Sequence, residues 1–373
     1  MKVCILSMQR VNNFGSLLQS YSLKKLIESM GHEVSFIDIK PSAEDDALIN
    51  HEDIFNSSER EGDSFASKIR KIDRYTFNRI RIKQKAKQQN EKFEMFRKEV
   101  LGIKSGDNEK KYDICVIGSD EVFNCYGNSK WGFTSQLFGN VAQADRVITY
   151  AASCGSTKYE NLSESAKKVV KNAFTNIEGF SVRDENTKEF VEKFTDKVIL
   201  QNFDPVIFGN FNWESESTGD EIALPEHYCI IYSYYNRIHT RDEISMINEF
   251  AQRKKMKIIS VGAPQYWINT HMVLSPFEMI SVFKNADYVI TDTFHGTIFS
   301  YKFAKRYAII MRESNKNKLA DLIRRLEIEE HLFSKEKNSL DKIFTVNSDK
   351  EKVCNVEKMA EKSAREYLNL HLK

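Results

Sequence analysis

Short apolar runs alternate with amphipathic stretches along this 373-residue chain. Residues 2–8 (KVCILSM) are mostly apolar, residues 17–30 carry apolar positions at helical spacing, and residues 33–39 (EVSFIDI) return to an extended pattern. Gly31 follows the periodic segment, which is where a helix ends most readily. The beginning of the chain therefore predicts a strand, a helix and a second strand, which make one βαβ unit.

The alternation continues to residue 202, with a break at about residues 48–110. Further strands are expected at residues 112–119, 145–153, 177–182 and 197–202, and helices at about residues 163–176 and 187–194. Strands that alternate with helices are typical of a parallel sheet covered by helices. We therefore expect residues 1–215 to form a Rossmann-like domain with a helical insertion at about residues 48–110.

A second series follows residues 212–226, whose Ser, Glu and Gly content is typical of a linker. Its strands are expected at residues 228–234, 257–262, 288–291 and 307–310, with helices that end near residue 255, begin at residue 276 and cover residues 319–328. Residues 220–345 thus predict a second Rossmann-like domain. A chain of this length allows each doubly wound domain to bury its own core, and we expect the two to face each other across a cleft. Residues 350–373 predict a helix that packs back on the first domain.

Two helix starts in the second series carry capping-box patterns. Thr240 is followed three residues later by Glu243, and Ser275 is followed by Glu278 with proline at the first helical position. In such a box the hydroxyl and the carboxylate each accept a hydrogen bond from a backbone amide that the helix leaves free. We expect both boxes to form.

The insertion contains a strongly basic segment. Between Lys68 and Lys87 the chain holds nine Lys or Arg residues and a single acid, Asp73, and apolar positions recur at spacings of three and four from Phe65 to Ile80. This pattern predicts a basic amphipathic helix. Two interpretations stay open: a solvated helix that lies on the domain, or a helix attracted to an anionic membrane or to a lipid-linked phosphorylated acceptor.

Composition excludes several classes of function. The 55 basic and 53 acidic residues nearly cancel, so nothing in the net charge favours nucleic acid as a partner. The six cysteines form no C-x-x-C pair and no Cys/His cluster, which predicts reduced thiols and no metal site. No run of 18 apolar residues occurs. We expect a cytoplasmic protein, with contact to the inner face of the membrane left open.

The segment from Ala286 to Ser300 (ADYVITDTFHGTIFS) places His295 where a strand leads into a helix. In an open parallel sheet, ligands bind at the carboxyl ends of the strands, where helix amides point at anions. We expect the amides of Gly296 and Thr297 to face a phosphate or carboxylate, and His295 to donate a proton or a hydrogen bond. Alternatively, His295 caps its own helix or fills the core.

The first turn between a strand and a helix (QRVNNFGSLLQSYSL) provides the matching element of the first domain. It contains one glycine, Gly15, and therefore neither the G-x-G-x-x-G pattern of a dinucleotide site nor a P-loop. This argues against NAD and ATP bound in those ways. Asn13 and Gln19 are candidates for hydrogen bonds to hydroxyl groups, although an Asn-Gly turn is often only a turn.

Polar side chains stand at three further candidate positions. Asp120 ends the strand in VIGSDEVFN, and Arg183 ends the strand in FSVRDEN. A guanidinium at the edge of a sheet suits a carboxylate or phosphate, but an ion pair between Arg183 and Asp120 is an equal structural explanation. Lys316 and Lys318 follow the last predicted strand, which makes them spatial neighbours of His295.

With these residues identified, the sequence resembles the polysaccharide pyruvyl transferase family. The resemblance covers most of the chain to about Phe333 and rests on an ordered series of motifs: NNFGSLLQSYSL, VIGSDEVFN, YAASCG, SVRDENT, DPVIF, SPFEMI and ADYVITDTFHGTIFSYKF. It implies a fold similar to the two-domain GT-B glycosyltransferases. It also implies transfer of pyruvate from phosphoenolpyruvate to two hydroxyls of a sugar, with a cyclic ketal and phosphate as products and no cofactor.

The resemblance also implies roles for individual residues. Arg183 and His295 would form the donor-binding and catalytic pair, and Lys318 would be a second cation for the phosphate. Asn13, Gln19 and Asp120 would bind the acceptor, a sugar or a lipid-linked oligosaccharide. Two positions depart from the family's common pattern, Ser16 and Thr293, and neither removes a charge.

Two other classes of function stay open at this point. A nucleotide-sugar glycosyltransferase of the GT-B type would use the same cleft between two domains. A catalytically silent binding protein of an envelope-assembly complex would need neither Arg183 nor His295 for its function.

Overall fold

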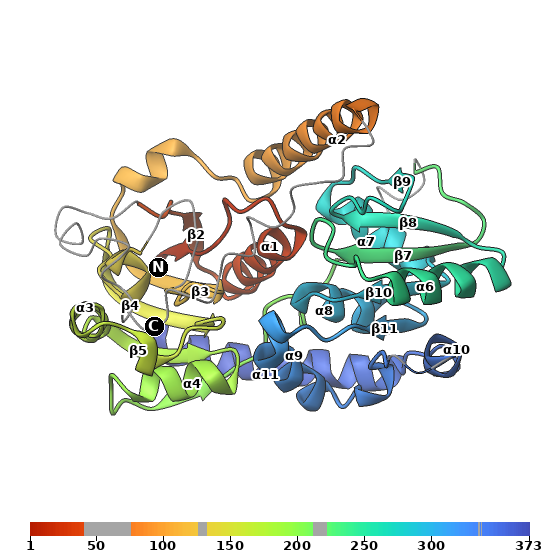
Figure 1. Ribbon diagram of the computed structural model, residues 1–373. Helices are drawn as coiled ribbons and strands as arrows, with labels where there is room; N and C mark the ends of the chain where they lie inside the picture. The colour runs from red at the N-terminus through yellow and green to blue at the C-terminus, as the bar shows by residue number, and fades with distance from the viewer. Residues whose placement is uncertain (41–75, 126–132, 212–221, 335, 337) are drawn as a thin grey trace.

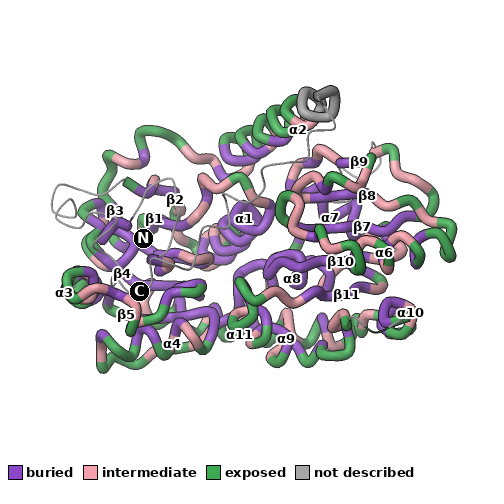
Figure 2. The backbone as a smooth tube through the Cα atoms, in the orientation of Figure 1, coloured by how far each residue is buried: buried purple, intermediate pink, exposed green. Residues whose placement is uncertain are grey.

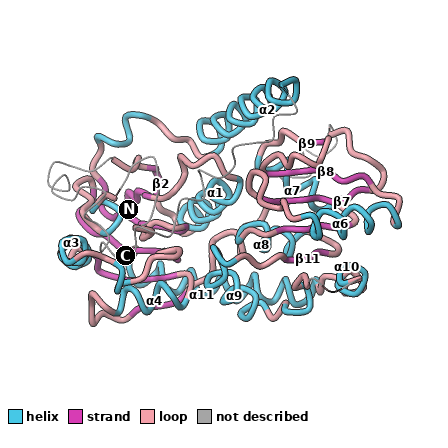
Figure 3. Tube along the Cα trace, in the orientation of Figure 1, coloured by secondary structure: helices cyan, strands magenta, loops and turns pink. Residues whose placement is uncertain are grey.

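Within the described residues the chain forms two lobes, each built on one sheet with helices on its faces (Figure 1 and Figure 3). A computed structural model of the protein describes residues 1–40, 76–125, 133–211, 222–334, 336 and 338–373. The first lobe holds the amino terminus, and the second begins after residue 222.

The first sheet has six strands in the order β2-β1-β3-β4-β5-β6, all paired in parallel. The strands are β1 (Lys2–Leu6), β2 (Glu33–Phe36), β3 (Tyr112–Asp120), β4 (Ala144–Ala152), β5 (Ile177–Val182) and β6 (Ile199–Gln201). Its helices are α1 (Phe14–Ser29), α3 (Glu164–Phe174) and α4 (Glu185–Glu192), with short turns η2 (Phe96–Val100), η3 (Ser105–Glu109), η4 (Ser135–Phe138) and η5 (Tyr159–Asn161). Since β2 and β3 flank β1, the topological switch point lies between β1 and β3.

The second sheet has five parallel strands in the order β11-β10-β7-β8-β9. The strands are β7 (Tyr228–Ser233), β8 (Lys257–Gly262), β9 (Thr270–His271), β10 (Tyr288–Thr291) and β11 (Tyr307–Ile309). Its helices are α6 (Arg241–Arg253), α7 (Pro276–Asn285), α8 (Phe294–Phe303), α9 (Lys316–Leu326) and α10 (Ser339–Ile343), with turns η6 (Glu313–Asn315) and η7 (Glu329–His331). Here the switch point lies between β7 and β10.

Two doubly wound parallel sheets confirm the predicted α/β class with tandem Rossmann-like lobes. Most predicted strands and helices match observed ones closely. The pattern missed β9 and α10, because elements of two and five residues are too short to show a periodicity.

Of the two predicted capping boxes, one forms. Ser275 and Glu278 cap each other at the start of α7. At the start of α6 the Thr240 hydroxyl accepts from the Glu243 amide, but the Glu243 carboxylate lies 2.6 Å from Arg312 instead of returning to the cap. A charged partner outcompetes a backbone amide there, because ionic hydrogen bonds are the stronger ones.

The largest apolar cluster of the described residues is shared by both lobes. It joins Val116 of β3 and Phe14 of α1 to Tyr232 of β7 and Phe299 of α8. Smaller clusters fill the outer faces of the two sheets. Figure 2 shows α1 and α8 buried along the boundary between the lobes. The expectation of one separate core per domain is therefore incomplete, since the lobes also pack through a common core.

Helix α2 (Thr76–Met95) lies over both lobes (Figure 1). The Gln89 side-chain amide donates to the Leu274 carbonyl at 2.7 Å and accepts from the Leu274 amide at 3.0 Å. Lys92 pairs with Glu278 at 2.6 Å, and Lys85 donates to a backbone carbonyl of the second lobe. The carboxyl-terminal part of the predicted insertion is therefore anchored to the opposite lobe.

Helix α11 (Lys350–His371) runs along the other side of the molecule, from the second lobe back to the first (Figure 1). Near its start Lys352 lies 3.2 Å from Glu327 of the second lobe. At its end the His371 carbonyl accepts from Arg146 of β4 at 2.9 Å. The two lobes are thus connected by α2 on one side and by α11 on the other.

The predicted membrane contact through Lys68 to Lys87 falls partly outside the described residues, which resume at Thr76. Within them, Lys85 is bound to the second lobe and Lys87 lies 3.9 Å from Glu91. Among the described helices, none is both long and apolar enough to cross a bilayer.

Replacing Gln89 by Ala is expected to weaken the attachment of α2 to the second lobe. The change removes both hydrogen bonds to Leu274 and leaves its buried backbone groups unpaired, at a cost of about 1–3 kcal/mol in the free energy of unfolding. Urea denaturation measures this cost. Gln88→Ala is the matched control, because Gln88 is exposed on the same helix turn. Equal stability of the two variants would contradict the assigned role of Gln89.

Candidate active site

Both topological switch points open onto one cavity between the lobes. The loops after β1 and β3 contribute Asn13 and Asp120, the loop after β7 contributes Tyr234, and Arg183 and His295 also line it. The cavity measures about 550 Å³, and a smaller hollow of about 100 Å³ continues toward the second sheet. Because open parallel sheets bind ligands at such switch points, this cavity is the candidate active site.

His295 enters the cavity because α8 begins at Phe294, directly after β10. Thr293 caps this helix, and its hydroxyl accepts from the Gly296 amide at 2.9 Å. A Cβ atom on Gly296 would lie 2.1 Å from the Thr291 hydroxyl oxygen. Glycine is therefore required at position 296 by the packing of the helix start.

The amides of Gly296 and Thr297 have partners within the helix start. The Gly296 amide donates to the Thr293 hydroxyl, and the Thr297 amide donates to the Thr293 carbonyl at 3.0 Å. The prediction that both amides are free to hold an anion is therefore wrong, because the cap uses them. His295 itself lines the cavity instead of capping the helix.

Gly15 of the first lobe packs closely against His295 of the second. A Cβ atom on Gly15 would lie 2.1 Å from Cγ and 2.6 Å from Cβ of His295. The imidazole of the second lobe is therefore packed directly on the first turn of α1. Only glycine at position 15 leaves the space that the ring occupies.

Asp204 is fully buried and contacts both Arg183 and His295, which line the cavity. Its Oδ2 atom lies 3.0 Å from Arg183 Nη1 and 3.4 Å from His295 Nε2, and it accepts from the Ser119 hydroxyl at 3.2 Å. Its Oδ1 atom accepts from the Val206 amide at 3.0 Å. One buried carboxylate thus holds a guanidinium of the first lobe beside an imidazole of the second.

The charges around Asp204 outweigh the effect of its burial. Burial by itself raises the pKa of a carboxyl group, but His295, Arg183 and the Val206 amide lower the pKa of Asp204 to about 2. For Arg183 burial acts to lower the pKa, and Asp204 and Asp120 raise it above its ordinary value. Asp204 and Arg183 therefore both stay charged at neutral pH.

One nitrogen atom in this cluster, Nε of Arg183, is buried without a hydrogen-bond partner. Nε2 of His295 is also buried, and its only polar contact among the described residues is the 3.4 Å ion-pair distance to Asp204, which is longer than a well-formed hydrogen bond. The Arg183 guanidinium also stacks on the Phe294 ring, 4.2 Å from its centroid. Unpaired buried donors are costly in a finished core, and at an active site they indicate groups that a ligand satisfies.

A second ion pair crosses the cavity. Lys318 of α9 donates to the Glu121 carboxylate, which also accepts from Asn124 at 2.7 Å. Although burial raises the pKa of Glu121, Lys318 and Arg183 bring it down to about 2. Lys318 therefore lies at the cavity as the sequence predicts, whereas Lys316 pairs with Glu313 and is exposed.

The three predicted acceptor residues lie in different places. Asn13 lines the cavity and caps α1, accepting from the Gly15 amide at 2.8 Å. Asp120 also lines it and accepts from the Ser16 hydroxyl at 2.6 Å. Gln19 is fully buried, and its side chain is bonded on both ends, to Ser7, Ser16, Ser20 and Ser119. Gln19 therefore supports the loops under the cavity and does not face an acceptor.

The alternative ion pair of Arg183 with Asp120 is present but secondary. The two side chains are 3.8 Å apart, whereas Asp204 is 3.0 Å from the same nitrogen. Asp204 was not among the predicted site residues, although it stands two residues after the predicted strand at residues 197–202, much as Arg183 directly follows its own strand. Its position shortly after a predicted strand is the sequence feature from which it could have been predicted.

A buried lysine fixes the loop that carries Asp204. Lys302 of α8 donates to the carbonyls of Val206, Ile207 and Gly209 at 2.8, 2.6 and 2.9 Å, and it lies 3.0 Å from Glu357 of α11. Burial outweighs the carboxylate and lowers the pKa of Lys302 to about 8. His295, the partner of Asp204, is also on α8. Lys302 therefore connects the loop that carries Asp204 to the helix that carries His295.

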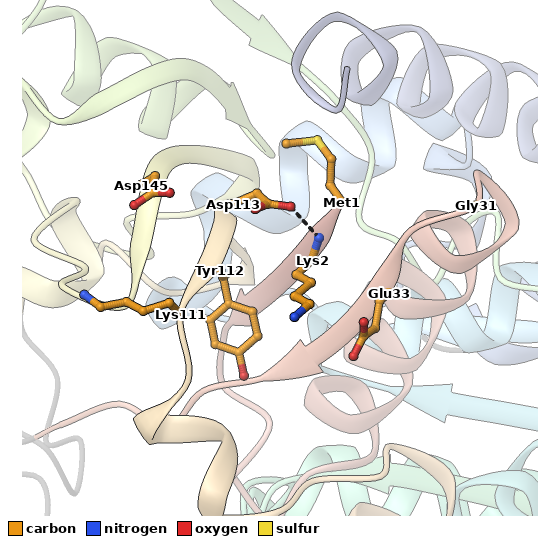
Figure 4. Close-up of a pocket in the computed structure, with 8 residues that line it drawn as sticks. All are labelled: Met1, Lys2, Gly31, Glu33, Lys111, Tyr112, Asp113 and Asp145. Carbon is orange, nitrogen blue, oxygen red and sulfur yellow. Dashed lines mark hydrogen bonds between the residues drawn. The ribbon is translucent and has the colours of Figure 1, made fainter.

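A second hollow of about 480 Å³ lies at the opposite end of the first sheet, where β1 and β3 begin (Figure 4). Its rim alternates lysines with acids, among them Lys2, Glu33, Lys111 and Asp113. The Lys2 amide donates to Asp113 at 2.7 Å across it. Ligands of parallel sheets bind at carboxyl ends of strands, so this hollow is not the candidate site.

Comparison with protein families identifies the chain. The model of the family described as "Polysaccharide pyruvyl transferase" matches residues 13–314, which include Asn13, Asp120, Arg183, Asp204 and His295. The chain belongs to the polysaccharide pyruvyl transferase family. This confirms the resemblance seen in the sequence motifs. No curated protein matches the sequence.

Several solved structures share the two-lobed arrangement with this family member. The UDP-N-acetylglucosamine 2-epimerase from Rickettsia bellii is 11% identical, with a TM-score of 0.48 over 99% of this chain and 96% of the epimerase. The Methanocaldococcus jannaschii UDP-GlcNAc 2-epimerase in complex with UDP-GlcNAc and UDP is 11% identical. Its TM-score is 0.45, and the match covers 96% of this chain and 99% of the epimerase. The spinosyn rhamnosyltransferase SpnG is 10% identical. Its TM-score is 0.44, and the match covers 99% of this chain and 100% of the rhamnosyltransferase. Likeness at this level carries no inference about chemistry.

The described parts of this pyruvyl transferase family member contain no group of side chains that could bind a metal ion. Among those residues no three His, Cys, Asp or Glu side chains are grouped so that they could hold a metal ion. The five described buried cysteines and the exposed Cys354 are free thiols. The polar groups of the candidate site are therefore the side chains around Asp204 and the Lys318–Glu121 pair.

Replacing Gly15 by Ala is expected to displace His295 from Asp204. The new methyl group overlaps the base of the imidazole, which cannot rotate away without moving α8. We expect kcat to fall at least about 100-fold, the typical contribution of a positioned proton donor. Gly106→Ala is the control, because a Cβ atom there meets nothing within 4 Å. Unchanged turnover of Gly15→Ala would refute the close packing of this pair.

The carboxylate of Asp204 should make the protein less stable in acid. Its folded pKa of about 2 lies below the ordinary value of 3.8, so its contribution is present above pH 4 and is lost as the pH falls through 2. The contribution is on the order of 2 kcal/mol. Urea denaturation between pH 2 and pH 5 should show a shallower pH dependence for Asp204→Asn. Asp341→Asn, which alters a surface pair with Arg253, is the control; equal slopes would contradict the assignment.

Proposed function

We propose that the protein transfers pyruvate from phosphoenolpyruvate to two hydroxyls of a sugar in a surface polysaccharide or its precursor. The observation that carries the proposal is the cluster in which Asp204 holds Arg183 and His295 together at the cavity, with Nε of Arg183 buried and without a hydrogen-bond partner. Family membership supports the same class of reaction.

The reaction needs one proton donor and two hydroxyl nucleophiles. A proton from the His295 imidazolium adds to the methylene carbon of phosphoenolpyruvate, and the first hydroxyl attacks the neighbouring carbon, which becomes electron-poor. The bond from that carbon to the bridging oxygen then breaks, phosphate leaves, and the second hydroxyl closes the ketal. The two hydroxyls release two protons, of which one restores the imidazolium and the other neutralises the leaving phosphate.

Electrostatics around the cavity suit this sequence of steps. Phosphoenolpyruvate brings a carboxylate and a phosphate, and Arg183 supplies a planar fork while Lys318 supplies a second cation. In the ligand-free protein these cations are neutralised by Asp204 and Glu121. Asn13 and Asp120 remain at the cavity to bind acceptor hydroxyls.

Incubation with phosphoenolpyruvate and a panel of glycans tests the proposal. We expect phosphate release only with an acceptor present, together with a glycan product that carries a pyruvate ketal by mass spectrometry. His295→Ala should lower kcat at least about 100-fold, because it removes the proton donor. His239→Ala is the matched control, since this exposed imidazole contacts only the Arg237 carbonyl among its described partners.

Two outcomes would count against the proposal. Full activity of His295→Ala would refute the role of the imidazole. Thermal stabilisation by nucleotide diphosphates but not by phosphoenolpyruvate would favour the alternative, a nucleotide-sugar glycosyltransferase of the GT-B type.

A further inference from the structure

Three exposed tyrosines lie on two neighbouring loops, and one of them, Tyr234, lines the cavity. Tyr234, Tyr235 and Tyr266 are 49%, 60% and 56% exposed, and they are the only exposed large aromatic side chains in the described parts of the chain. All three lie on the loops that follow β7 and β8. Exposed aromatic rings scattered singly need no explanation, but a cluster beside a cavity marks a binding surface.

The two loops are bonded to each other, so the rings occupy fixed positions. The buried Gln265 side chain donates to the Tyr234 carbonyl at 2.8 Å, and the Tyr266 amide donates to the Asn236 side chain at 2.8 Å. The Asn236 amide in turn donates to a carbonyl of the second loop, that of Pro264, at 3.3 Å. A rigid loop that keeps its rings in solvent loses little conformational entropy when it binds a partner.

This tyrosine ledge, formed by Tyr234, Tyr235 and Tyr266, is continuous with the candidate active site. Tyr234 lines the main cavity together with His295 and Lys318, and it also lines the smaller hollow. A molecule that extends out of the cavity past Tyr234 meets the two loops that carry the other two rings.

We propose that the tyrosine ledge binds the sugar units that flank the acceptor sugar, so that the protein selects an oligosaccharide over a single sugar. The inference rests on the proposed function, since it names the subsite next to the transfer cavity. A pyranose ring presents one face of C–H groups that packs on an aromatic ring, while its hydroxyls reach the phenol oxygens and water. Three exposed rings on two loops that are bonded to each other offer several such surfaces.

Charge at the ledge favours a glycan over a nucleotide-linked sugar. A nucleotide would bring a diphosphate that needs cations. Arg237, whose guanidinium lies 5.3 Å from the Tyr234 ring centroid, already donates to Ser314 at 2.6 Å and lies 3.6 Å from the buried Asp292 carboxylate. Arg237, which stacks on the ledge, is thus already paired within the second lobe.

Saturation-transfer NMR and calorimetry with oligomers of glucose, galactose and N-acetylglucosamine, of one to six residues, test the ledge directly. We expect hexamers to bind more tightly than monomers. The variant Tyr235→Ala/Tyr266→Ala should weaken hexamer binding about tenfold and leave monomer binding unchanged. The variant Tyr235→Phe/Tyr266→Phe should keep most of the affinity because the rings remain. Met359→Ala is the control, since Met359 is also 56% exposed but lies on α11.

The outcomes separate this inference from the proposed function. Hexamers that bind no more tightly than monomers, an unchanged affinity in the double Ala variant, or UDP bound at the ledge would each overturn the inference. Stabilisation of the protein by phosphoenolpyruvate is measured separately. If it occurs without ledge binding, the proposed function survives alone. If oligomers bind the ledge and phosphoenolpyruvate neither binds nor releases phosphate, the ledge stands as a glycan site and the proposed function fails.

Discussion

The shared carboxylate of Asp204 is the interaction on which the candidate site depends. A guanidinium and an imidazole placed side by side without an anion would repel each other whenever the imidazole is protonated, and burial would oppose both charges. Asp204 offsets this repulsion, and it is itself held by Ser119 and the Val206 amide. Arg183 belongs to the first lobe and His295 to the second, so the same carboxylate also fixes where the lobes meet.

The meeting of the lobes is supported at several points around that carboxylate. Gly15 leaves room for the imidazole on the first turn of α1, and Lys302 ties the loop of Asp204 to α8. At a greater distance α2 and α11 attach to both lobes on opposite sides of the molecule. Because the largest apolar cluster runs through both lobes, the candidate site lies in a shared core rather than in a gap between independent domains.

The inside of the cavity and the surface beside it differ in chemistry, and each suits a different part of the expected substrates. Cations paired with Asp204 and Glu121 lie inside, where a small anion with two acidic groups would exchange partners with those carboxylates. Exposed tyrosine rings lie at the mouth, where only an uncharged and extended molecule gains by packing on them. This gradient from charged to aromatic agrees with a donor of high charge and an acceptor made of sugars.

The sequence by itself determined the elements and the ends of the strands at which function lies. Apolar runs and helical spacing predicted both parallel sheets, because burial on two faces demands such patterns, and the strand ends identified Arg183, His295, Asp120 and Lys318 as neighbours. Only the tertiary structure decided which partners these residues have. The Gly296 and Thr297 amides bond within the start of their own helix, and the Gln19 side chain bonds within a buried network, because the local acceptors and donors lie at the right distance only once the chain is folded. The roles of Asp204 and Gly15 come from contacts between residues about 90 to 280 positions apart, and no periodicity along the chain encodes such distances.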